Sequence, residues 1–263
     1  MLNFDFKKSF GQNFLQDDNI INKIVNSSNI DKDTLLIEIG PGAGALSKKT
    51  IPLSGYAILY EIDTRLKEIL DNVLKEYSNY EIIFNDVLKQ DIKSDISKFN
   101  YKKIYVVANL PYYITTPIIT KLIDDVYPDK IVIMIQDEVA DRLSANVGNR
   151  DYGMISVLLG AKYDIKKLFK VSRNCFKPAP NVDSAVISLD KHNKYVINDE
   201  KVFDKLIKDA FKYKRKNLRN NLSGYDLIKI DKLLNDNGFS LSDRAEVISV
   251  ALFVDIANML SNS

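Results

Sequence analysis

The sequence predicts an α/β fold in which a mostly parallel sheet carries helices on both faces and a small all-helical domain follows it. Two observations lead to this fold class. Short apolar segments alternate with amphipathic helical patterns in the first half of the chain, as in proteins built from repeated strand and helix units. The C-terminal part holds helical patterns with no apolar strand between them. The expected domains are residues 1–192 and residues 193–263.

Each strand is expected at a short apolar run. The stretch at 63–77 repeats apolar side chains at helical spacing, which predicts a helix between two strands. A further strand pair is expected at 163–172 and 183–190. Because the sites of parallel sheets lie at the carboxyl ends of the strands, a functional site is expected at those ends. The five principal runs lie at residues 35–40, 56–63, 81–86, 104–109 and 130–136.

The remainder of the chain differs in kind. Residues 191–200 are polar and predict a linker, and no internal repeat or low-complexity tract occurs. Three helical patterns then follow without intervening strands, at residues 201–222, 226–238 and 244–260.

Composition restricts the class of protein. With 46% hydrophobic and 27% charged residues in a chain of 263, a globular protein is expected. No run of about 18 apolar residues occurs, and residues 1–14 lack the apolar core of a secretion signal, so a cytoplasmic monomer with no membrane partner is expected. The single Cys175 and the single His192 leave no cysteine and histidine cluster for zinc, and no metal is expected.

The distribution of charge is more informative than the net charge of +2. Residues 205–219 hold seven basic side chains against Asp209, and residues 162–177 hold six against Asp164. Each run is either a solvated face or a surface for phosphate groups, and two runs in a balanced chain favour nucleic acid. The candidate RNA-binding residues lie within little more than two turns of the helix expected at 201–222, and they are Lys212, Lys214, Arg215, Lys216 and Arg219.

The first two strand ends carry groups suited to a nucleoside. The turn at 40–44 holds Gly40, Gly42 and Gly44, which permits a tight turn and the close approach of a ligand to the backbone. Its spacing is not that of the dinucleotide fingerprint. Glu61 ends the second strand about 20 residues later, where a carboxylate can accept hydrogen bonds from both ribose hydroxyls. Any tight connection can use glycines, and Glu61 could equally be a surface carboxylate.

The next two strand ends complete the pattern. Asp86 can accept a hydrogen bond from an adenine amine, while Val87 and Leu88 offer apolar contact to the ring. The fourth strand ends at Asn109. Because all four suitable groups fall on one rim of the sheet, the sequence predicts an adenosine pocket with a reaction centre at its fourth corner.

The segment that follows, Asn109-Leu110-Pro111-Tyr112, is either an ordinary turn or a catalytic one. The amine of adenine is a poor nucleophile because its lone pair is delocalised into the ring. The Asn109 side-chain oxygen and the Leu110 carbonyl could accept the two amine hydrogens, with Pro111 fixing the turn. Tyr112 could stack on the base after its extrusion from an RNA stack. This scheme needs no histidine base.

The motifs resemble those of the KsgA-type rRNA adenine dimethyltransferases, in the family's order and over nearly the whole chain. The resemblance implies a Rossmann-like class I methyltransferase sheet, S-adenosylmethionine as donor, and two adjacent adenosines near the 3′ end of small-subunit rRNA as target, in a ribosomal subunit or its precursor. The matching motifs are KSFGQNFL (8–15), IEIGPGAGALS (37–47), YEID (60–63), ND (85–86), ANLPYYITTPI (108–118), FKPAPNVDSAVI (176–187), FKYKRKNLRNNL (211–222) and RAEVISV (244–250).

The resemblance also assigns site residues. Phe176 is implied as the opposite face of the base stack, although a core aromatic is the alternative from the sequence alone. Many members carry Asn where this chain has Tyr113. The implied donor-binding positions are Asn13, Leu15, Gly40, Glu61, Asp86 and Asn109, and the target-base positions are Asn109, Leu110, Pro111 and Tyr112.

Three alternatives remain at this point. The related family that dimethylates large-subunit rRNA and confers macrolide resistance shares the fold and nearly the same active site, and residues 109–118, 180–187 and 244–250 favour the small-subunit family. A non-catalytic RNA-binding assembly factor would not need an intact Asn109 to Tyr112 with Glu61 and Asp86. A nicotinamide dehydrogenase lacks its glycine spacing here.

Overall fold

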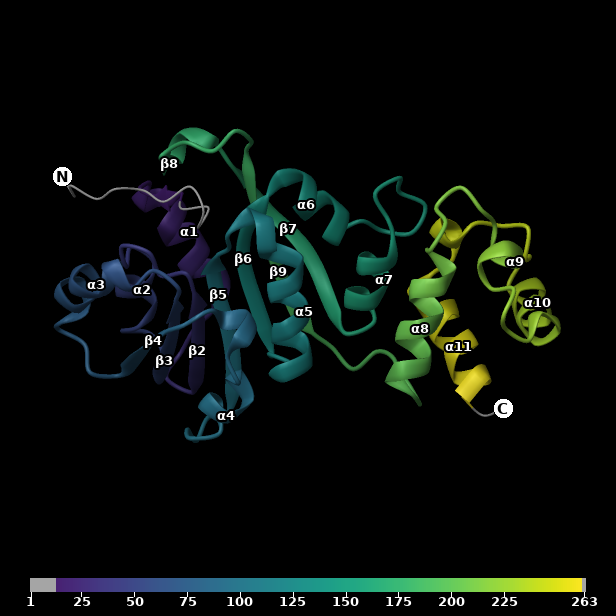
Figure 1. Ribbon diagram of the computed structural model, residues 1–263, viewed down its shortest axis with the longest axis horizontal. Coiled ribbons are helices and arrows are strands. Elements are labelled where there is room, and N and C mark those ends of the chain that lie inside the picture. Colours follow the sequence, from purple (N-terminus) through teal and green to yellow (C-terminus); the bar gives the residue numbers. More distant parts are fainter. Residues whose placement is uncertain (1–12, 262–263) are drawn as a thin grey trace. The chain divides into compact units, whose positions relative to one another are not determined.

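The central feature of the computed structural model, which describes residues 13–261, is a seven-stranded sheet. Its strand order is β4-β3-β2-β5-β6-β9-β7, and the strands can be followed in Figure 1. Neighbouring strands from β4 to β6 run parallel, whereas β9 runs antiparallel to β6. The strands are β2 (Thr34–Ile39), β3 (Tyr56–Glu61), β4 (Tyr80–Phe84), β5 (Lys103–Asn109), β6 (Lys130–Gln136), β7 (Tyr163–Val171) and β9 (Ser184–Lys191).

The strands β2, β3 and β6 form where the sequence predicts them because nearly all of their side chains are apolar and buried. All six residues of β2 are buried, as expected of a strand covered by helices on both sides. The strand pair expected after residue 162 is also confirmed, as the adjacent strands β7 and β9. The predicted class, a mostly parallel α/β sheet followed by helices, is therefore confirmed.

Helices and 3₁₀ turns connect these strands. The first helix, α1, begins after Asp17, whose carboxylate accepts hydrogen bonds from the backbone N–H groups of Asn19 and Ile20 at 2.8 and 3.2 Å. Among the residues that the structure describes, no helix is long and apolar enough to cross a membrane. The connecting elements are α1 (Asp18–Ser28), α2 (Ser47–Thr50), η2 (Thr64–Leu66), α3 (Lys67–Leu74), η3 (Val87–Lys89), α4 (Ile92–Ile96), η4 (Tyr112–Ile114), α5 (Thr115–Asp125), α6 (Asp137–Leu143) and η5 (Arg173–Cys175).

One hydrophobic core packs helices against the sheet. It joins apolar side chains of the strands to the buried faces of α1 and α3. Each fully buried aliphatic side chain contributes roughly 1.5 to 3 kcal/mol relative to exposure, so this core fixes the positions of the strand ends. Its strand members include Leu36, Ala57, Leu59, Val107, Val132, Met134, Val171 and Val186, and its helix members include Ile21, Ile24, Leu66, Leu70 and Leu74.

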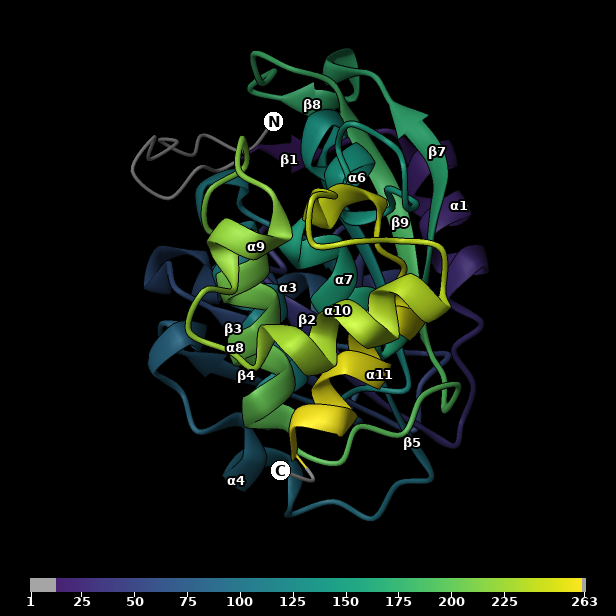
Figure 2. The same cartoon turned by 90° about the vertical axis from the view of Figure 1, so that its right-hand side faces the viewer.

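A second compact unit is formed by residues 141–165 together with 191–263, and the first unit holds the residues up to Ala140 with Lys166–Asp190. The second unit has its own core, in which α8 and α11 pack side by side, as Figure 2 shows. Its elements are α7 (Met154–Gly160), α8 (Glu200–Ala210), α9 (Leu218–Asn221), α10 (Leu227–Asp236), η6 (Ala245–Val247) and α11 (Val250–Ser261).

The compact unit thus also includes α7, which precedes the boundary expected between residues 192 and 193. Tyr152, just before α7, belongs to the second core, and its hydroxyl donates to the Ile248 carbonyl at 3.0 Å. The division of labour between residues 1–192 and 193–263 stays a prediction.

The single helix expected over residues 201–222 is wrong, because α8 ends at Ala210 and α9 begins only at Leu218. Two asparagines favour the break. The Asn221 side chain donates to the last carbonyl of α8, at Ala210, over 2.7 Å. The Asn217 side chain accepts from the Asn220 N–H at 3.1 Å and caps α9. The basic side chains at 212–216 also repel one another, and an uninterrupted helix would bring them closer together.

Candidate active site

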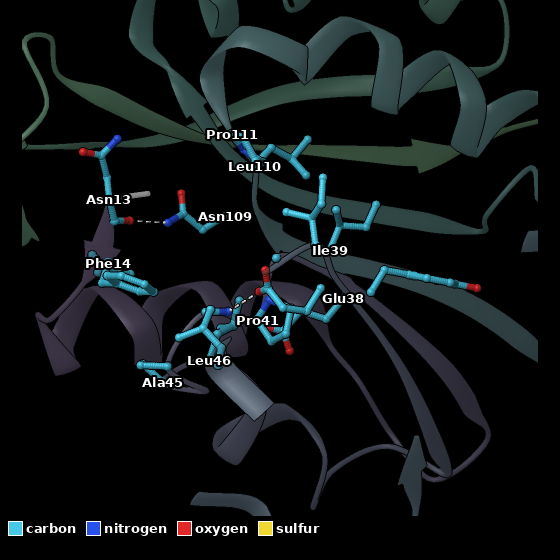
Figure 3. A pocket seen from close by; sticks show the side chains of 18 of the residues that line it. Asn13, Phe14, Glu38, Ile39, Pro41, Ala45, Leu46, Asn109, Leu110 and Pro111 are labelled. Atoms are coloured by element: carbon cyan, nitrogen blue, oxygen red, sulfur yellow. Dashed lines mark hydrogen bonds between the residues drawn. The ribbon is translucent and has the colours of Figure 1, made fainter. Parts of the chain in front are cut away.

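A cavity of about 560 Å³ lies at the carboxyl ends of the first parallel strands. This volume is in the range of small-molecule sites. Figure 3 shows side chains that line it. The predicted site residues that the structure brings together around it are Asn13, Leu15, Gly40, Gly42, Glu61, Asp86, Val87, Asn109, Leu110, Pro111 and Tyr112.

The glycine turn after β2 forms one wall. Gly40 and Gly42 have φ angles of +69° and +58°, a left-handed conformation that residues with a Cβ rarely adopt. A Cβ on Gly42 would also lie 2.6 Å from the Phe14 ring. The turn therefore needs glycine both for its conformation and for the close approach of residue 14.

Glu61, the last residue of β3, is held by this turn. Its carboxylate accepts hydrogen bonds from the Gly42 N–H at 3.1 Å and from the Asp63 N–H at 2.9 Å. Only 4% of Glu61 is exposed, and burial raises the pKa of the carboxyl, while the two backbone hydrogen bonds oppose the rise. Two carboxylate oxygens accept about four hydrogen bonds, so Glu61 retains capacity for two ribose hydroxyls.

Glu38, in β2, is a cavity residue that the sequence analysis missed. It is 2% exposed, and burial raises its pKa to about 8, with the nearby Glu61 carboxylate adding to the rise. Within residues 13–261 its Oε2 atom has no hydrogen-bond partner. The signal was a lone acid inside the apolar strand LLIEIG. One oxygen of this buried carboxyl therefore remains available to a hydrogen bond from a ligand.

Asp86 and Val87 follow β4 on the same rim. The Asp86 carboxylate accepts from the Leu88 N–H at 3.0 Å and so caps the 3₁₀ turn η3. Val87 is buried beside it and lines the cavity. One acceptor and one apolar side chain are the groups that an adenine ring and its amine require.

Asn109, the last residue of β5, is oriented by the N-terminal segment. Its amide nitrogen donates to the Asn13 carbonyl at 3.1 Å, the contact drawn as a dashed line in Figure 3. Because the bond uses the nitrogen, the amide oxygen is the atom that can accept from a substrate. Asn13 was predicted only through the family resemblance, because no local sequence pattern indicates a contact between residues 96 positions apart, such as Asn13 and Asn109.

A short antiparallel ladder holds that N-terminal segment. In it β1 (Phe14–Leu15) pairs with β8 (Phe176–Lys177), Leu15 opposite Phe176. Residues 8–12 of the motif KSFGQNFL lie outside the described residues.

The turn after Asn109 is fixed by several hydrogen bonds. The Leu110 N–H donates to the Met134 carbonyl at 3.1 Å, and Pro111 adopts φ −60° and ψ 128°. Tyr112 lines the cavity, and its hydroxyl forms a 2.6 Å hydrogen bond with Ser184 Oγ. Burial raises the pKa of the Tyr112 hydroxyl. The turn thus presents an amide, a backbone carbonyl and an aromatic ring from a rigid frame.

Two aromatic residues behave differently from Tyr112. Phe176 is 5% exposed, packs in the same core cluster as Leu15, and is not among the residues that line the cavity. Its role as the second face of a base stack stays a prediction. Tyr113 lines the cavity and is 58% exposed.

The basic candidates belong to the other compact unit, and the cavity residues all belong to the first. Residues 212–216 form turns between α8 and α9, and Arg219 lies in α9. Lys214, Arg215 and Lys216 are exposed. The second basic run is partly neutralised, since Lys167 and Lys170 both form ion pairs with Asp137, at 2.6 and 2.8 Å.

The side chains that line the cavity fit a nucleoside. They combine acceptors for the ribose and the adenine with an apolar wall. In the part of the chain that the structure describes, no group of three or more histidine, cysteine, aspartate or glutamate side chains could hold a metal ion.

Comparisons with known proteins agree with this geometry. A family model described as ribosomal RNA adenine dimethylase matches residues 3–262. A ribosomal RNA small subunit methyltransferase A from Streptococcus pneumoniae serotype 2 (strain D39) is 42% identical and covers 98% of this chain and 92% of its own. The protein of that name from Bacillus mycoides (strain KBAB4) is 41% identical with the same coverage.

Solved structures show the same fold. A dimethyladenosine transferase from Plasmodium falciparum aligns with a TM-score of 0.77 and 25% identity over 94% of this chain and 96% of its own. The 23S rRNA methyltransferase ErmE aligns with a TM-score of 0.77 and 21% identity over 95% of this chain and 100% of its own. The chain therefore belongs to the ribosomal RNA adenine dimethylase family, whose enzymes use S-adenosylmethionine as the methyl donor.

Proposed function

We propose that this methyltransferase transfers methyl groups from S-adenosylmethionine to the N6 amines of two adjacent adenosines near the 3′ end of small-subunit rRNA. The observation that carries the proposal is the Asn109 to Tyr112 turn, held on the rim of the cavity with the Asn109 amide oriented by Asn13. The names of the 42% and 41% identical relatives support the small subunit as the target.

The first step assigned to this chain is to hold the donor. Glu61 would accept hydrogen bonds from the ribose, Asp86 would accept one from the adenine amine, and Val87 would contact the ring. Asn13, Leu15, Gly40 and Gly42 complete the wall. When bound, S-adenosylmethionine supplies a methyl group on a positively charged sulfur and needs no further activation.

The second step is to prepare the target amine. In the first transfer the Asn109 side-chain oxygen and the Leu110 carbonyl would accept its two hydrogens, which localises the nitrogen lone pair. One of these hydrogens leaves as a proton to solvent when the nitrogen gains the methyl group. The one that remains would engage a single acceptor in the second transfer. Tyr112 stacks on the flipped base and restricts its position. Both acceptors are held in place by hydrogen bonds, from the Asn109 amide to the Asn13 carbonyl and from the Leu110 N–H to the Met134 carbonyl. Little reorganisation of the protein therefore accompanies the reaction.

The third step is to dock the RNA. Lys212, Lys214, Arg215, Lys216 and Arg219 offer positive charge to phosphates, which basic side chains bind without reading sequence. The proposed substrate is a ribosomal subunit or its precursor, so the proposed location is the cytoplasm. A monomer is proposed because one chain supplies all the residues assigned here, and analytical ultracentrifugation tests it.

A large-subunit target is the main competing function. The catalytic turn suits either RNA, because it contacts only the adenine amine and ring. The test is to map dimethylated adenosines in both rRNAs from cells with and without the gene. Loss of two adjacent dimethyladenosines from small-subunit rRNA, restored by the gene, is expected. Loss from large-subunit rRNA alone would contradict the proposal.

A further inference from the structure

The hydroxyl of Tyr112 is tied to a residue that the catalytic scheme does not use. Ser184 Oγ lies 2.6 Å from it, and Ser184 has no exposed surface. Ser184 is the first residue of β9 and pairs with Gln136, the last residue of β6. It belongs to the motif PNVDSAVI, to which neither donor binding nor amine activation assigns a role.

The bond to Ser184 completes the fixation of the tyrosine. The Thr115 hydroxyl donates to the Pro111 carbonyl at 3.2 Å and approaches the Tyr112 carbonyl at 3.4 Å, which holds the backbone end. Ser184 holds the far end of the ring. A ring fixed at both ends keeps the plane of its face, on which stacking depends.

We propose that Ser184 is a positioning residue, which anchors the Tyr112 hydroxyl so that the ring is set for stacking on the target adenine before the RNA arrives. This inference rests on the proposed function of Tyr112. It gives the Tyr112 hydroxyl a role of its own, because stacking on the base requires only the aromatic ring.

The inference distinguishes two outcomes for Tyr112→Phe. If the ring alone matters, this variant keeps most of the activity. If the anchor matters, Tyr112→Phe and Ser184→Ala lose activity to the same degree, because each breaks the same bond. The double variant then loses no more than either single variant, since the interaction is already absent.

The test measures single-turnover methylation of small ribosomal subunits with saturating donor. We expect about a tenfold lower rate for Ser184→Ala and for Tyr112→Phe, the scale of one neutral hydrogen bond. Ser184→Thr keeps a hydroxyl and should restore the rate. The matched control is Ser188→Ala, which removes a buried hydroxyl from the same face of β9, where Ser188 pairs with Val132.

Donor affinity, measured by calorimetry, should be unchanged in all five variants, which separates positioning from a general loss of structure. Wild-type rates in Ser184→Ala, or a double-variant loss equal to the product of the single losses, would overturn the proposal.

A measurement on the free protein makes the outcome independent of the RNA target. Relaxation of labelled tyrosine rings in solution NMR reports the mobility of Tyr112. Ser184→Ala should increase that mobility, and Ser188→Ala should not. Equal ring order in the wild type and Ser184→Ala would refute the anchor even if the substrate differed, whereas an inactive wild type with an anchored ring would refute only the proposed function.

Discussion

At the scale of single residues, the cavity is defined by acceptors whose positions are set by backbone hydrogen bonds. Glu61 is held by Gly42 and Asp63, Asp86 by Leu88, and Asn109 by Asn13. These three acceptors were predicted from the sequence. Each lies at the end of an apolar run, and the carboxyl ends of parallel strands meet on one rim of the sheet. Glu38 was missed, although a charged residue within an apolar strand is unusual.

Glu61→Ala is expected to weaken donor binding. Each hydrogen bond to a charged acceptor contributes roughly 1 to 3 kcal/mol, and the variant loses two of them to the ribose while leaving the Gly42 N–H without its acceptor. Glu61→Gln keeps one acceptor oxygen, so its donor affinity should lie between those of the wild type and Glu61→Ala. Titration calorimetry with S-adenosylmethionine measures the effect, and unchanged affinity in Glu61→Ala would remove Glu61 from the donor site.

Glu38→Gln is expected to change how stability depends on pH. The pKa of Glu38 is raised to about 8, so the folded protein favours the neutral carboxyl. Stability contributed by this group is complete below the ordinary pKa of about 4.3 and is lost as the pH rises through about 8. Glutamine cannot ionise, so the stability of the variant relative to the wild type should increase as the pH rises from about 4.3 to about 8 and then stay constant, by on the order of a few kcal/mol in total.

Thermal unfolding of both proteins without donor, followed from pH 5 to pH 9, tests this sign. A stability difference that stays constant with pH would show that the Glu38 carboxyl does not titrate as described.

At the scale of elements, the turn after β2 and the short strand β1 support one another. A methyl group on Gly42 would meet the Phe14 ring at 2.6 Å, in a left-handed backbone conformation. The sequence predicted the turn because glycines mark it, but it could not predict the contact with Phe14. That contact depends on the ladder between β1 and β8, which joins residues far apart in the chain.

Gly42→Ala is therefore expected to destabilise the turn for two separate reasons. The left-handed conformation costs an alanine about 1 to 2 kcal/mol, and the contact with Phe14 adds to this cost. Combining Gly42→Ala with Phe14→Ala should relieve the contact but not the backbone strain. Thermal unfolding and donor calorimetry measure the effects of the backbone strain and of the Phe14 contact. A Gly42→Ala variant as stable as the wild type would exclude both.

Sequence patterns predicted long apolar elements well and their ends less well. Strands β2, β3 and β6 were recovered because burial on both faces produces continuous apolar runs. The helix expected over 201–222 was wrong because its break depends on side-chain caps at Asn217 and Asn221, which a hydrophobic period does not register. Phe176 illustrates the same limit, since a core aromatic and a stacking aromatic have the same sequence signature.

At the scale of the whole molecule, the cavity and the basic candidate residues belong to different compact units. The cavity belongs to the unit that carries the sheet, and the exposed basic turn at 212–216 belongs to the helical unit. This division predicts that donor binding and RNA docking can be altered separately.

Replacing Lys214, Arg215 and Lys216 with Gln should weaken binding to small subunits and flatten its salt dependence. Each lost phosphate contact removes about one unit of the salt slope, so a change of up to about three units is expected. Donor affinity should not change. The control replaces three exposed lysines of the same unit, Lys201, Lys229 and Lys232, with Gln. If both triple variants show the wild-type slope, the docking surface lies elsewhere.

The proposed catalytic mechanism depends most on Asn109, because its side-chain oxygen is assigned to act on the amine in the transition state. The most direct measurement is single-turnover methylation of small subunits by Asn109→Ala with saturating donor. We expect a rate lower by about 10²- to 10³-fold, as for loss of one preorganised hydrogen-bonding group, with RNA affinity largely retained. A rate within a few fold of the wild type would contradict it.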